Sequence, residues 1–390
     1  MKLFFTLITL VFIVFAIPVE GQVKVGASNL EAVLGLLSSK HVGIVANPAS
    51  VVGNRGVNIV DTLIRRGVQI KSIFCPEHGF RSFAEAGQLI PNRVDSITKL
   101  PVISLYGKKK RPSQEDLTGL DIVVFDLQDV GVRFFTYIST LTYVMEACAG
   151  SGIPLVVLDR PNPNGFYIDG PVLEKEFTSF VGLHPVPVVY GMTIGEYAKM
   201  VNGEKWMSGG TSCNLTVIPL ENYNHSTLYE LPVKPSPNLT TQNAVYLYPS
   251  LCFFEGTRVS VGRGTLFPFE IFGHPEMKGF SFEFIPESIP GMSSRPPFEG
   301  VLCRGLDLRH FYEARPKMFG RLNLSWLLMA HKDMGGGPDF FTDYFDKLVG
   351  TSTLRKQMLD GKTENQIRLS WQPAIEAFKK IRAKYLIYPE

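Results

Sequence analysis

Residues 121–126 read DIVVFD, in which three β-branched residues and one phenylalanine lie between two aspartates. A short run without polar alternation is typical of a strand that is buried on both faces of a parallel sheet. Comparable runs occupy residues 41–46, 69–74, 101–106 and 154–159. Apolar residues at helical spacing occupy residues 57–66 and 134–149. This alternation of strands and helices predicts an α/β fold with a mostly parallel sheet.

The chain has 390 residues, more than one hydrophobic core usually organises, and its character changes after the proline-rich stretch 231–238. We therefore expect a Rossmann-like catalytic domain at residues 22–230 and a smaller α+β auxiliary domain at residues 231–390. Helices are expected in the latter near residues 325–331, 341–349 and 373–384. Hydrophobic residues make up 45%, charged residues 19%, and the net charge is +3, which excludes extensive disorder and a dominant polyanionic partner.

The amino terminus has the pattern of a secretory signal peptide. Met1-Lys2 precede an apolar run that ends at Pro18, and Gly21 provides a small residue at the exit. We expect residues 1–21 to be removed by cleavage near Gly21, and the mature protein to be periplasmic or secreted, without contact to a membrane.

The five cysteines are odd in number and far apart, which argues against a zinc ribbon or a dense disulfide framework and leaves one disulfide open.

Polar residues follow four of the predicted strands. Ligands of open parallel sheets bind outside the carboxyl ends of the strands. Each residue alone is equally well explained as a turn former or a helix cap, but four polar strand ends at one rim indicate a binding site. The candidate residues at these ends are Asn47, Glu77, His78, Asp126, Gln128, Asp129, Asp159, Arg160 and Asn162.

Glu77 is the first candidate for a catalytic acid. Pro76 stiffens its turn and Gly79 allows a sharp bend, so the carboxyl group is expected on a fixed loop. Glycoside hydrolases use two carboxyl groups, of which one has a pKa raised by desolvation and protonates the leaving oxygen while the other stays ionised. Glu77 together with either Asp126 or Asp129 is the hypothetical pair in this chain.

Arg133 and Tyr137 lie at the predicted start of the helix that follows. An arginine suits an acidic substituent of a substrate, and an aromatic ring suits the face of a sugar. Tyr137 also fits the core-facing stripe of that helix. Both residues are candidates for substrate binding, and Arg133 is the stronger one.

The chain resembles the exo-β-N-acetylmuramidases of glycoside hydrolase family 171 over nearly its whole length after residue 21. The segments that carry the resemblance are VGIVANP (42–48), PEHGF (76–80), AGQ (86–88), residues 101–107, VFDLQDVGVRFFTY (124–137), DRPNP (159–163), GMTIGE (191–196), FEGT (254–257), SVGRGT (260–265) and SWQP (370–373). The resemblance implies that a Rossmann-like domain, joined to an auxiliary domain, removes N-acetylmuramic acid (MurNAc) from the non-reducing end of peptidoglycan-derived disaccharides and muropeptides, such as MurNAc-GlcNAc. It implies no cofactor and no metal. It gives the main catalytic role to Glu77, and it adds Glu255 and Arg263 as substrate-binding residues.

Two other interpretations stay open. A metal-dependent cell-wall hydrolase is suggested by His78 beside Glu77, although no H-E-x-x-H motif or close Cys/His spacing supports it. A non-catalytic periplasmic protein that binds muropeptides would keep Arg133 and Arg160 but would not need Glu77. The basic run at residues 108–111 is typical of a solvated loop and does not indicate a nucleic-acid partner.

Overall fold

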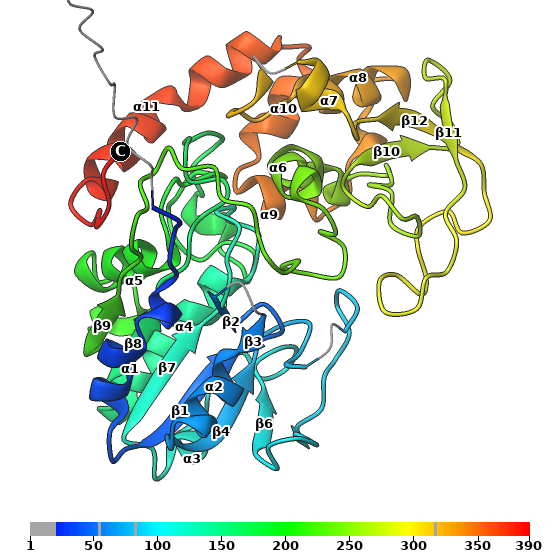
Figure 1. Ribbon diagram of the computed structural model, residues 1–390. Helices are drawn as coiled ribbons and strands as arrows, with labels where there is room; N and C mark the ends of the chain where they lie inside the picture. Colours follow the sequence, from blue (N-terminus) through cyan, green and yellow to red (C-terminus); the bar gives the residue numbers. More distant parts are fainter. Residues whose placement is uncertain (1–20, 54–55, 82–83, 316–317) are drawn as a thin grey trace, which may run out of the picture.

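The computed structural model describes residues 21–53, 56–81, 84–315 and 318–390 (Figure 1). Apart from Gly21, the predicted signal peptide therefore lies outside the described residues. Within the described ranges, no helix combines the length and the apolar character needed to cross a membrane.

The main sheet contains seven strands within the described part of the chain, in the order β5-β6-β4-β1-β7-β8-β9. Their bounds are β1 His41–Ala46, β4 Gln69–Cys75, β5 Arg93–Val94, β6 Pro101–Ser104, β7 Ile122–Asp126, β8 Leu155–Leu158 and β9 Leu215–Ile218. All neighbours pair in parallel except the edge strand β5, which is antiparallel to β6. Without β5, the order along the sheet is the 3-2-1-4-5-6 order of Rossmann sheets. The predicted mostly parallel sheet is confirmed.

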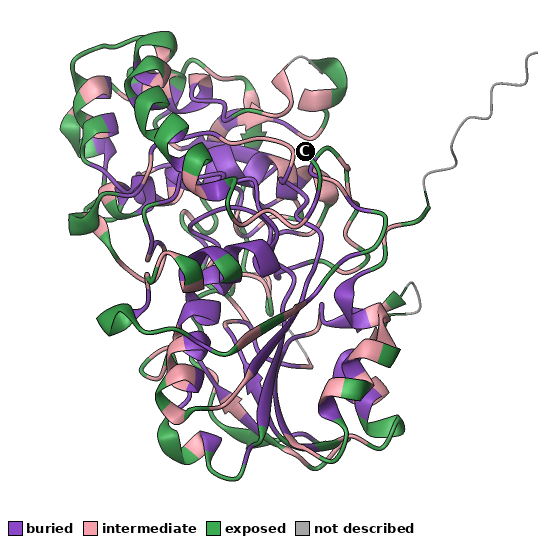
Figure 2. Cartoon of the chain, turned by 90° about the vertical axis from the view of Figure 1, so that its left-hand side faces the viewer, coloured by how far each residue is buried: buried purple, intermediate pink, exposed green. Residues whose placement is uncertain are grey.

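Helices cover both faces of this sheet (Figure 1). Helices α1 Leu30–Leu37 and α2 Ile59–Arg65 pack on one face, and α3 Gln114–Leu117, α4 Tyr137–Ser151 and α5 Ile194–Gly203 pack on the other. Residues of β7 alternate between the two cores, since Ile122 and Val124 face α1 and α2 while Val123 and Phe125 face α4 and α5. Figure 2 shows the strands as the buried layer between partly exposed helices. Burial on both faces explains why these strands lack polar alternation.

The remainder of the chain is a helical region with a small sheet, as expected for an α+β domain. Strands β10 Ile271–His274, β12 Cys303–Asp307 and β11 Phe282–Phe284 form an antiparallel sheet in that order. The helices are α6 Gln242–Leu251, η5 Cys252–Gly256, α7 Phe311–Ala314, α8 Ser325–Asp333, η7 Pro338–Phe340, α9 Phe345–Val349, α10 Thr353–Leu359 and α11 Glu364–Arg382. The shorter elements nearer the amino terminus are η1 Gly26–Ser28, β2 Val51–Val52, β3 Val57–Asn58, η3 Lys175–Phe177 and η4 Ser208–Gly210.

Capping residues move two helix boundaries away from the predicted ones. The helix expected from residue 57 begins at Ile59, because the Asn58 side chain accepts a hydrogen bond from Val60 N. The helix expected to start at Pro373 begins nine residues earlier, where Thr363 and Gln366 form a capping box. Pro373 lies inside α11, next to exposed turns of the helix where water can satisfy the carbonyl that loses its partner.

The carboxyl terminus returns to the first domain. Tyr388 donates its hydroxyl proton to Asp159 Oδ2 at 2.6 Å, and the amides of Ile387 and Tyr388 donate to Glu196 Oε1 at 2.8 and 3.2 Å. The apolar core on the α4–α5 face also continues without interruption into the second part of the chain. The expected boundary between residues 230 and 231 thus separates segments that share one core.

Candidate active site

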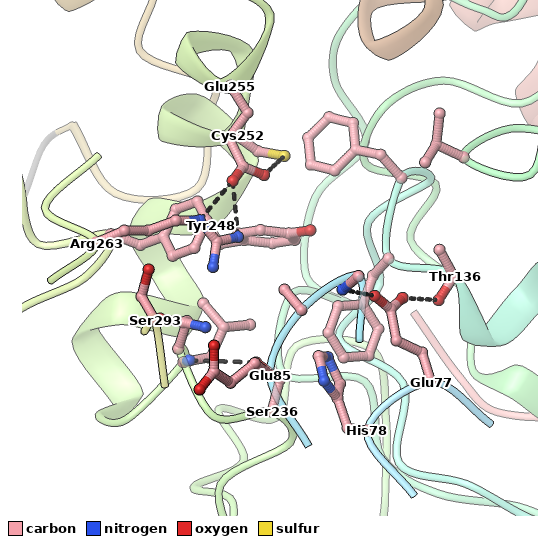
Figure 3. Close-up of a pocket in the computed structure, with 18 of the residues that line it drawn as sticks. Glu77, His78, Glu85, Thr136, Ser236, Tyr248, Cys252, Glu255, Arg263 and Ser293 are labelled. Atoms are coloured by element: carbon pink, nitrogen blue, oxygen red, sulfur yellow. Dashed lines mark hydrogen bonds and ion pairs between the residues drawn. The ribbon is translucent and has the colours of Figure 1, made fainter. Parts of the chain in front are cut away.

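A cavity of about 660 Å³ lies between the loops after β4 and β7 and the second part of the chain (Figure 3). This volume is in the range of sites for small molecules. One wall carries Glu77, His78, Tyr106, Thr136 and Tyr137, and the other carries Tyr248, Glu255, Arg263, Ser293 and Arg295. Five residues named from the sequence therefore line a single cavity: Glu77, His78, Tyr137, Glu255 and Arg263.

The turn after β4 presents two side chains to this cavity. Gly79 N donates to Pro76 O at 3.1 Å, which makes Glu77 and His78 the central residues of the turn. His78 has φ 76°, in the left-handed region, so the bend does not depend on Gly79 alone. Such a conformation of a non-glycine residue costs on the order of 1–3 kcal/mol and persists where neighbouring contacts enforce it. Here Ala84 enforces it, because Ala84 N donates to His78 O at 2.8 Å.

The Glu77 carboxylate is oriented by a donor on each oxygen. Oε1 accepts from Gly87 N at 3.1 Å, and Oε2 accepts from the Thr136 hydroxyl at 3.1 Å (Figure 3). Thr136 occupies the N-cap position of α4, but its backbone is helical and its side chain makes no capping bond; its hydroxyl instead donates to Glu77. Burial and the neighbouring Glu77 carboxylate raise the pKa of Tyr106, so this phenol keeps its proton beside Glu77.

His78 is a neutral neighbour of Glu77. Its Nδ1 lies 2.8 Å from Ala84 O, and because a carbonyl oxygen only accepts, Nδ1 carries the proton. Burial lowers the pKa of His78, and the positive charge of Arg263 lowers it further, against the opposing effect of the Glu77 carboxylate. The other ring nitrogen is therefore an acceptor near neutral pH.

The opposite wall carries a fixed ion pair. Arg263 donates from Nε to Glu255 Oε1 at 2.7 Å, and its Nη2 lies 2.7 Å from the same oxygen. The Cys252 thiol lies 3.6 Å from Glu255 Oε2, and the Arg263 guanidinium lies over the Phe269 ring at 5.2 Å. The family resemblance predicted Glu255 and Arg263 as substrate-binding residues, and both line the cavity.

Residues 84–88, termed the bridging segment below, connect the two walls. The Glu85 carboxylate accepts from Gly291 N, Ser294 N and the Ser294 hydroxyl at 3.0, 2.9 and 2.8 Å. These hydrogen bonds lower the pKa of Glu85, with the Ser294 amide making the largest contribution. Two residues later, Gly87 donates to Glu77. Sequence reasoning missed this role of Glu85, as it missed Thr136 and Tyr106.

Asp126 is not at the cavity, which corrects the hypothetical pairing of Glu77 with Asp126. The Asp126 carboxylate is fully buried and accepts from Arg160 Nε at 2.6 Å and Nη2 at 2.8 Å. Arg160 Nη2 also donates to Val51 O at 3.0 Å. The carboxyl end of β7 is thus filled by an internal ion pair, and neither member lines the cavity.

The other strand-end residues also bond to the protein and do not line the cavity. Asn47 Nδ2 donates to the Tyr137 hydroxyl; Gln128 Nε2 donates to Pro161 O; Asp129 Oδ2 accepts from Gly131 N and from the Tyr190 hydroxyl; Asp159 accepts from Thr193, Gly195 and Tyr388; Asn162 Nδ2 donates to Met192 O. The expectation that they contact substrate is corrected, because their polar groups hold the loops of the rim.

Arg133 joins the two parts of the chain. Its side chain is fully buried, Nη1 donates to Pro171 O and Val186 O at 2.8 and 2.9 Å, and Nη2 donates to Leu348 O and Val349 O at 3.1 and 2.6 Å. These four carbonyls use the donors that a substrate carboxylate would need. The substrate-binding role expected for Arg133 is corrected to a structural one.

No group of three or more His, Cys, Asp or Glu side chains in the described ranges is arranged to hold a metal ion. All five cysteines lie in those ranges, and each is free and buried. The disulfide that the sequence left open is therefore not formed.

Two family models and one relative match this chain over most of its length. A family model for the exo-β-N-acetylmuramidase NamZ, N-terminal, matches residues 42–243, and the corresponding C-terminal model matches residues 246–388. A peptidoglycan β-N-acetylmuramidase NamZ of Bacillus subtilis is 39% identical over 369 residues, which are 90% of this chain and 88% of the relative.

Two crystal structures of DUF1343 family proteins from Bacteroides fragilis are similar to this fold. The first has a TM-score of 0.87 and 42% identity, and the match covers 95% of this chain and 100% of the other. The second has a TM-score of 0.76 and 27% identity, and the match covers 94% and 99%. The likeness therefore includes both parts of the chain.

Proposed function

Because this chain belongs to the family of the exo-β-N-acetylmuramidase NamZ, we propose that it is a glycosidase that releases MurNAc from the non-reducing end of peptidoglycan fragments such as MurNAc-GlcNAc. The observation that carries the residue assignment is the position of Glu77. Its carboxylate lines the cavity between the two parts of the chain and is held by Gly87 N and the Thr136 hydroxyl.

Glu77 serves as the proton donor to the glycosidic oxygen. Cleavage of a glycosidic bond needs protonation of the leaving oxygen, and a positioned carboxyl group supplies it. Two further described carboxylates line the cavity, and both are engaged by other groups. Glu85 accepts three hydrogen bonds from the loop at residues 291–294, and Glu255 is paired with Arg263. Glu77 accepts one hydrogen bond on each oxygen but has neither an ion-pair partner nor a bond to the loop at residues 291–294 among the described residues, so we assign the reacting bond to it.

Aromatic side chains on both walls suit the faces of a sugar ring. Tyr106, Phe135 and Tyr137 line the first wall, and Tyr248 and Tyr344 line the second. Ligand cavities commonly combine such apolar surfaces with a few polar groups that fix orientation. The cavity thereby supports binding of a carbohydrate and positioning of one of its bonds at Glu77.

Glu77→Gln tests this assignment. The amide keeps the size of the side chain but has no proton to give, so kcat on MurNAc-GlcNAc is expected to fall about 10²- to 10⁴-fold. The assay measures free MurNAc released from the disaccharide. Glu283→Gln is the matched control, because Glu283 is paired with Arg304 on the small sheet and does not line the cavity. A Glu77→Gln variant with wild-type turnover would refute the role of Glu77.

A second substrate separates proton donation from other roles. In a 2,4-dinitrophenyl glycoside of MurNAc the aglycone departs as a stable phenolate without protonation, so the defect of Glu77→Gln is expected to shrink on this substrate. An equal defect on both substrates would assign Glu77 to a step other than protonation. Release of no sugar at all by the wild type would favour a muropeptide-binding protein.

Export is part of the same proposal. We infer from residues 1–21 that the protein is periplasmic or secreted, where peptidoglycan fragments occur. The mass of the mature protein, purified from the native host, is expected to correspond to a chain that starts at Gln22. An intact Met1 on a protein found in the cytoplasm would contradict it.

A further inference from the structure

We propose that Arg263 selects the substrate by binding the lactyl carboxylate of MurNAc, and that Glu255 positions Arg263 for this contact. This inference rests on the proposed function, and it names the group that distinguishes MurNAc from GlcNAc at the non-reducing end. The two sugars differ by the lactyl ether on O3, which carries a carboxylate. A site that is selective for MurNAc therefore needs a cation or hydrogen-bond donors directed at that substituent.

Arg263 has free donors that face the cavity. Its Nε and Nη2 both face Glu255 Oε1 at 2.7 Å, on one side of the guanidinium. The third nitrogen points away from Glu255 into the cavity (Figure 3), and it has no hydrogen-bond partner among the described residues. The Arg263 side chain lines the cavity and is only 19% exposed, so its donors are largely shielded from bulk solvent. An arginine with unused donors in a cavity is suited to a carboxylate.

The surroundings hold the guanidinium in place. Glu255 lies on the short helix η5, the Phe269 ring packs under the guanidinium at 5.2 Å, and Gly262 and Gly264 adopt φ 75° and 82° on either side of Arg263. A side chain that is already fixed loses little conformational entropy when a ligand binds. Glu255 therefore acts as a positioning residue through Arg263.

Charge explains why a cation is needed at this point. Three carboxylates, those of Glu77, Glu85 and Glu255, line the cavity and would repel an acidic sugar. Arg263 neutralises Glu255 and presents its remaining N–H groups to the ligand. Arg295 also lines the cavity, but it is exposed on the loop at its rim. Arg133 and Arg160 are excluded because both are buried away from the cavity and do not line it.

The experiment changes the substrate and the residue separately. Values of kcat/KM are measured for MurNAc-GlcNAc and for an analogue whose lactyl carboxylate is a neutral carboxamide. The wild type is expected to prefer the acid roughly 10- to 100-fold, as for a charged hydrogen bond that is shielded from water. Equal kcat/KM values for the two substrates in the wild type would overturn the proposal without any variant.

Arg263→Gln is expected to lower kcat/KM for the acid and to leave the carboxamide nearly unaffected, so that the preference approaches one. This ratio does not depend on the folded fraction, which separates selectivity from a structural defect. Glu255→Gln is expected to reduce the preference partly, and Arg263→Lys to restore part of it. Arg295→Gln tests the other cation of the cavity and is expected to keep the preference, and Arg304→Gln, which lies outside the cavity, is the matched control. Loss of the preference in Arg295→Gln instead of Arg263→Gln would also overturn the proposal.

A binding measurement keeps this test independent of catalysis. Calorimetric titration of Glu77→Gln with free MurNAc and with GlcNAc is expected to show tighter binding of MurNAc, and the added Arg263→Gln change is expected to abolish the difference. If the wild type hydrolyses neither disaccharide, the proposed function fails, while this titration still decides the role of Arg263. A preference for MurNAc that survives Arg263→Gln refutes that role.

Discussion

Replacing Arg133 by methionine tests whether this arginine belongs to the structure or to the substrate site. Its guanidinium donates to four backbone carbonyls, two from the first part of the chain and two from the end of α9. Val186 O also accepts from Leu173 N at 3.1 Å, so three carbonyls would lose the donor that the described residues provide. An unsatisfied buried carbonyl costs about 1–3 kcal/mol, which puts the three together at about 3–9 kcal/mol. Removal of a costly buried cation offsets part of this.

We therefore expect Arg133→Met to lower the free energy of unfolding by about 3–5 kcal/mol. The measurement is urea unfolding followed by tryptophan fluorescence, together with initial rates at a temperature where the variant is folded. KM for MurNAc-GlcNAc is expected to stay at the wild-type value. Arg304→Met is the control, because both members of the Arg304–Glu283 pair are exposed and its loss is expected to change the free energy by less than about 1 kcal/mol. A large increase in KM with unchanged stability would refute the structural role.

Three further predictions concern pH, an internal ion pair and metal. Burial lowers the pKa of His184 from 6.5 to about 4. The unfolded chain therefore binds a proton at a higher pH than the folded protein, and the free energy of unfolding is expected to fall by up to about 3 kcal/mol as the pH drops from 6.5 towards 4. In urea denaturation at a series of pH values His184→Gln should flatten this dependence, whereas equal slopes for wild type and variant would contradict the shift. Asp126→Asn leaves the Arg160 guanidinium buried without its counter-charge, so the free energy of unfolding is expected to fall by about 3–5 kcal/mol. The folded variant is expected to keep its kcat. A lower kcat at unchanged stability would show that Asp126 is catalytic. Dialysis against EDTA should leave kcat/KM unchanged, since no cluster of three metal-binding side chains lies in the described ranges; activity that is lost and then restored by added Zn²⁺ would support the metal-dependent alternative.

The parallel sheet is predictable because most of its strands are apolar on both faces. Strand β9, Leu215–Ile218, was not predicted, since it lies at the edge of the sheet and its residues are only partly buried. The return of Tyr388 to Asp159 has no local signal either, because it joins residues 229 positions apart. Contacts of that kind depend on how the whole chain closes on itself.

The site is only partly predictable for a related reason. The strand-end rule found Glu77 and His78, but it also selected Asp126, Asp129 and Asp159. In a sequence, a carboxylate that binds a ligand and one that holds its own loop look the same, because they differ only in burial and in partners far along the chain. Thr136 shows the same limit: a threonine before a helix is ordinarily an N-cap, and only the structure shows that its hydroxyl donates to Glu77 instead.

The bridging segment couples the two walls of the cavity at the position of Glu77. Glu85 is bonded to the loop at residues 291–294, and Gly87, two positions on, is bonded to Glu77. The orientation of the Glu77 carboxylate thus depends on a loop of the second part of the chain, although residues 291–294 do not touch Glu77. A substitution in that loop is therefore expected to reach the proposed acid through residues 85–87, without a direct contact.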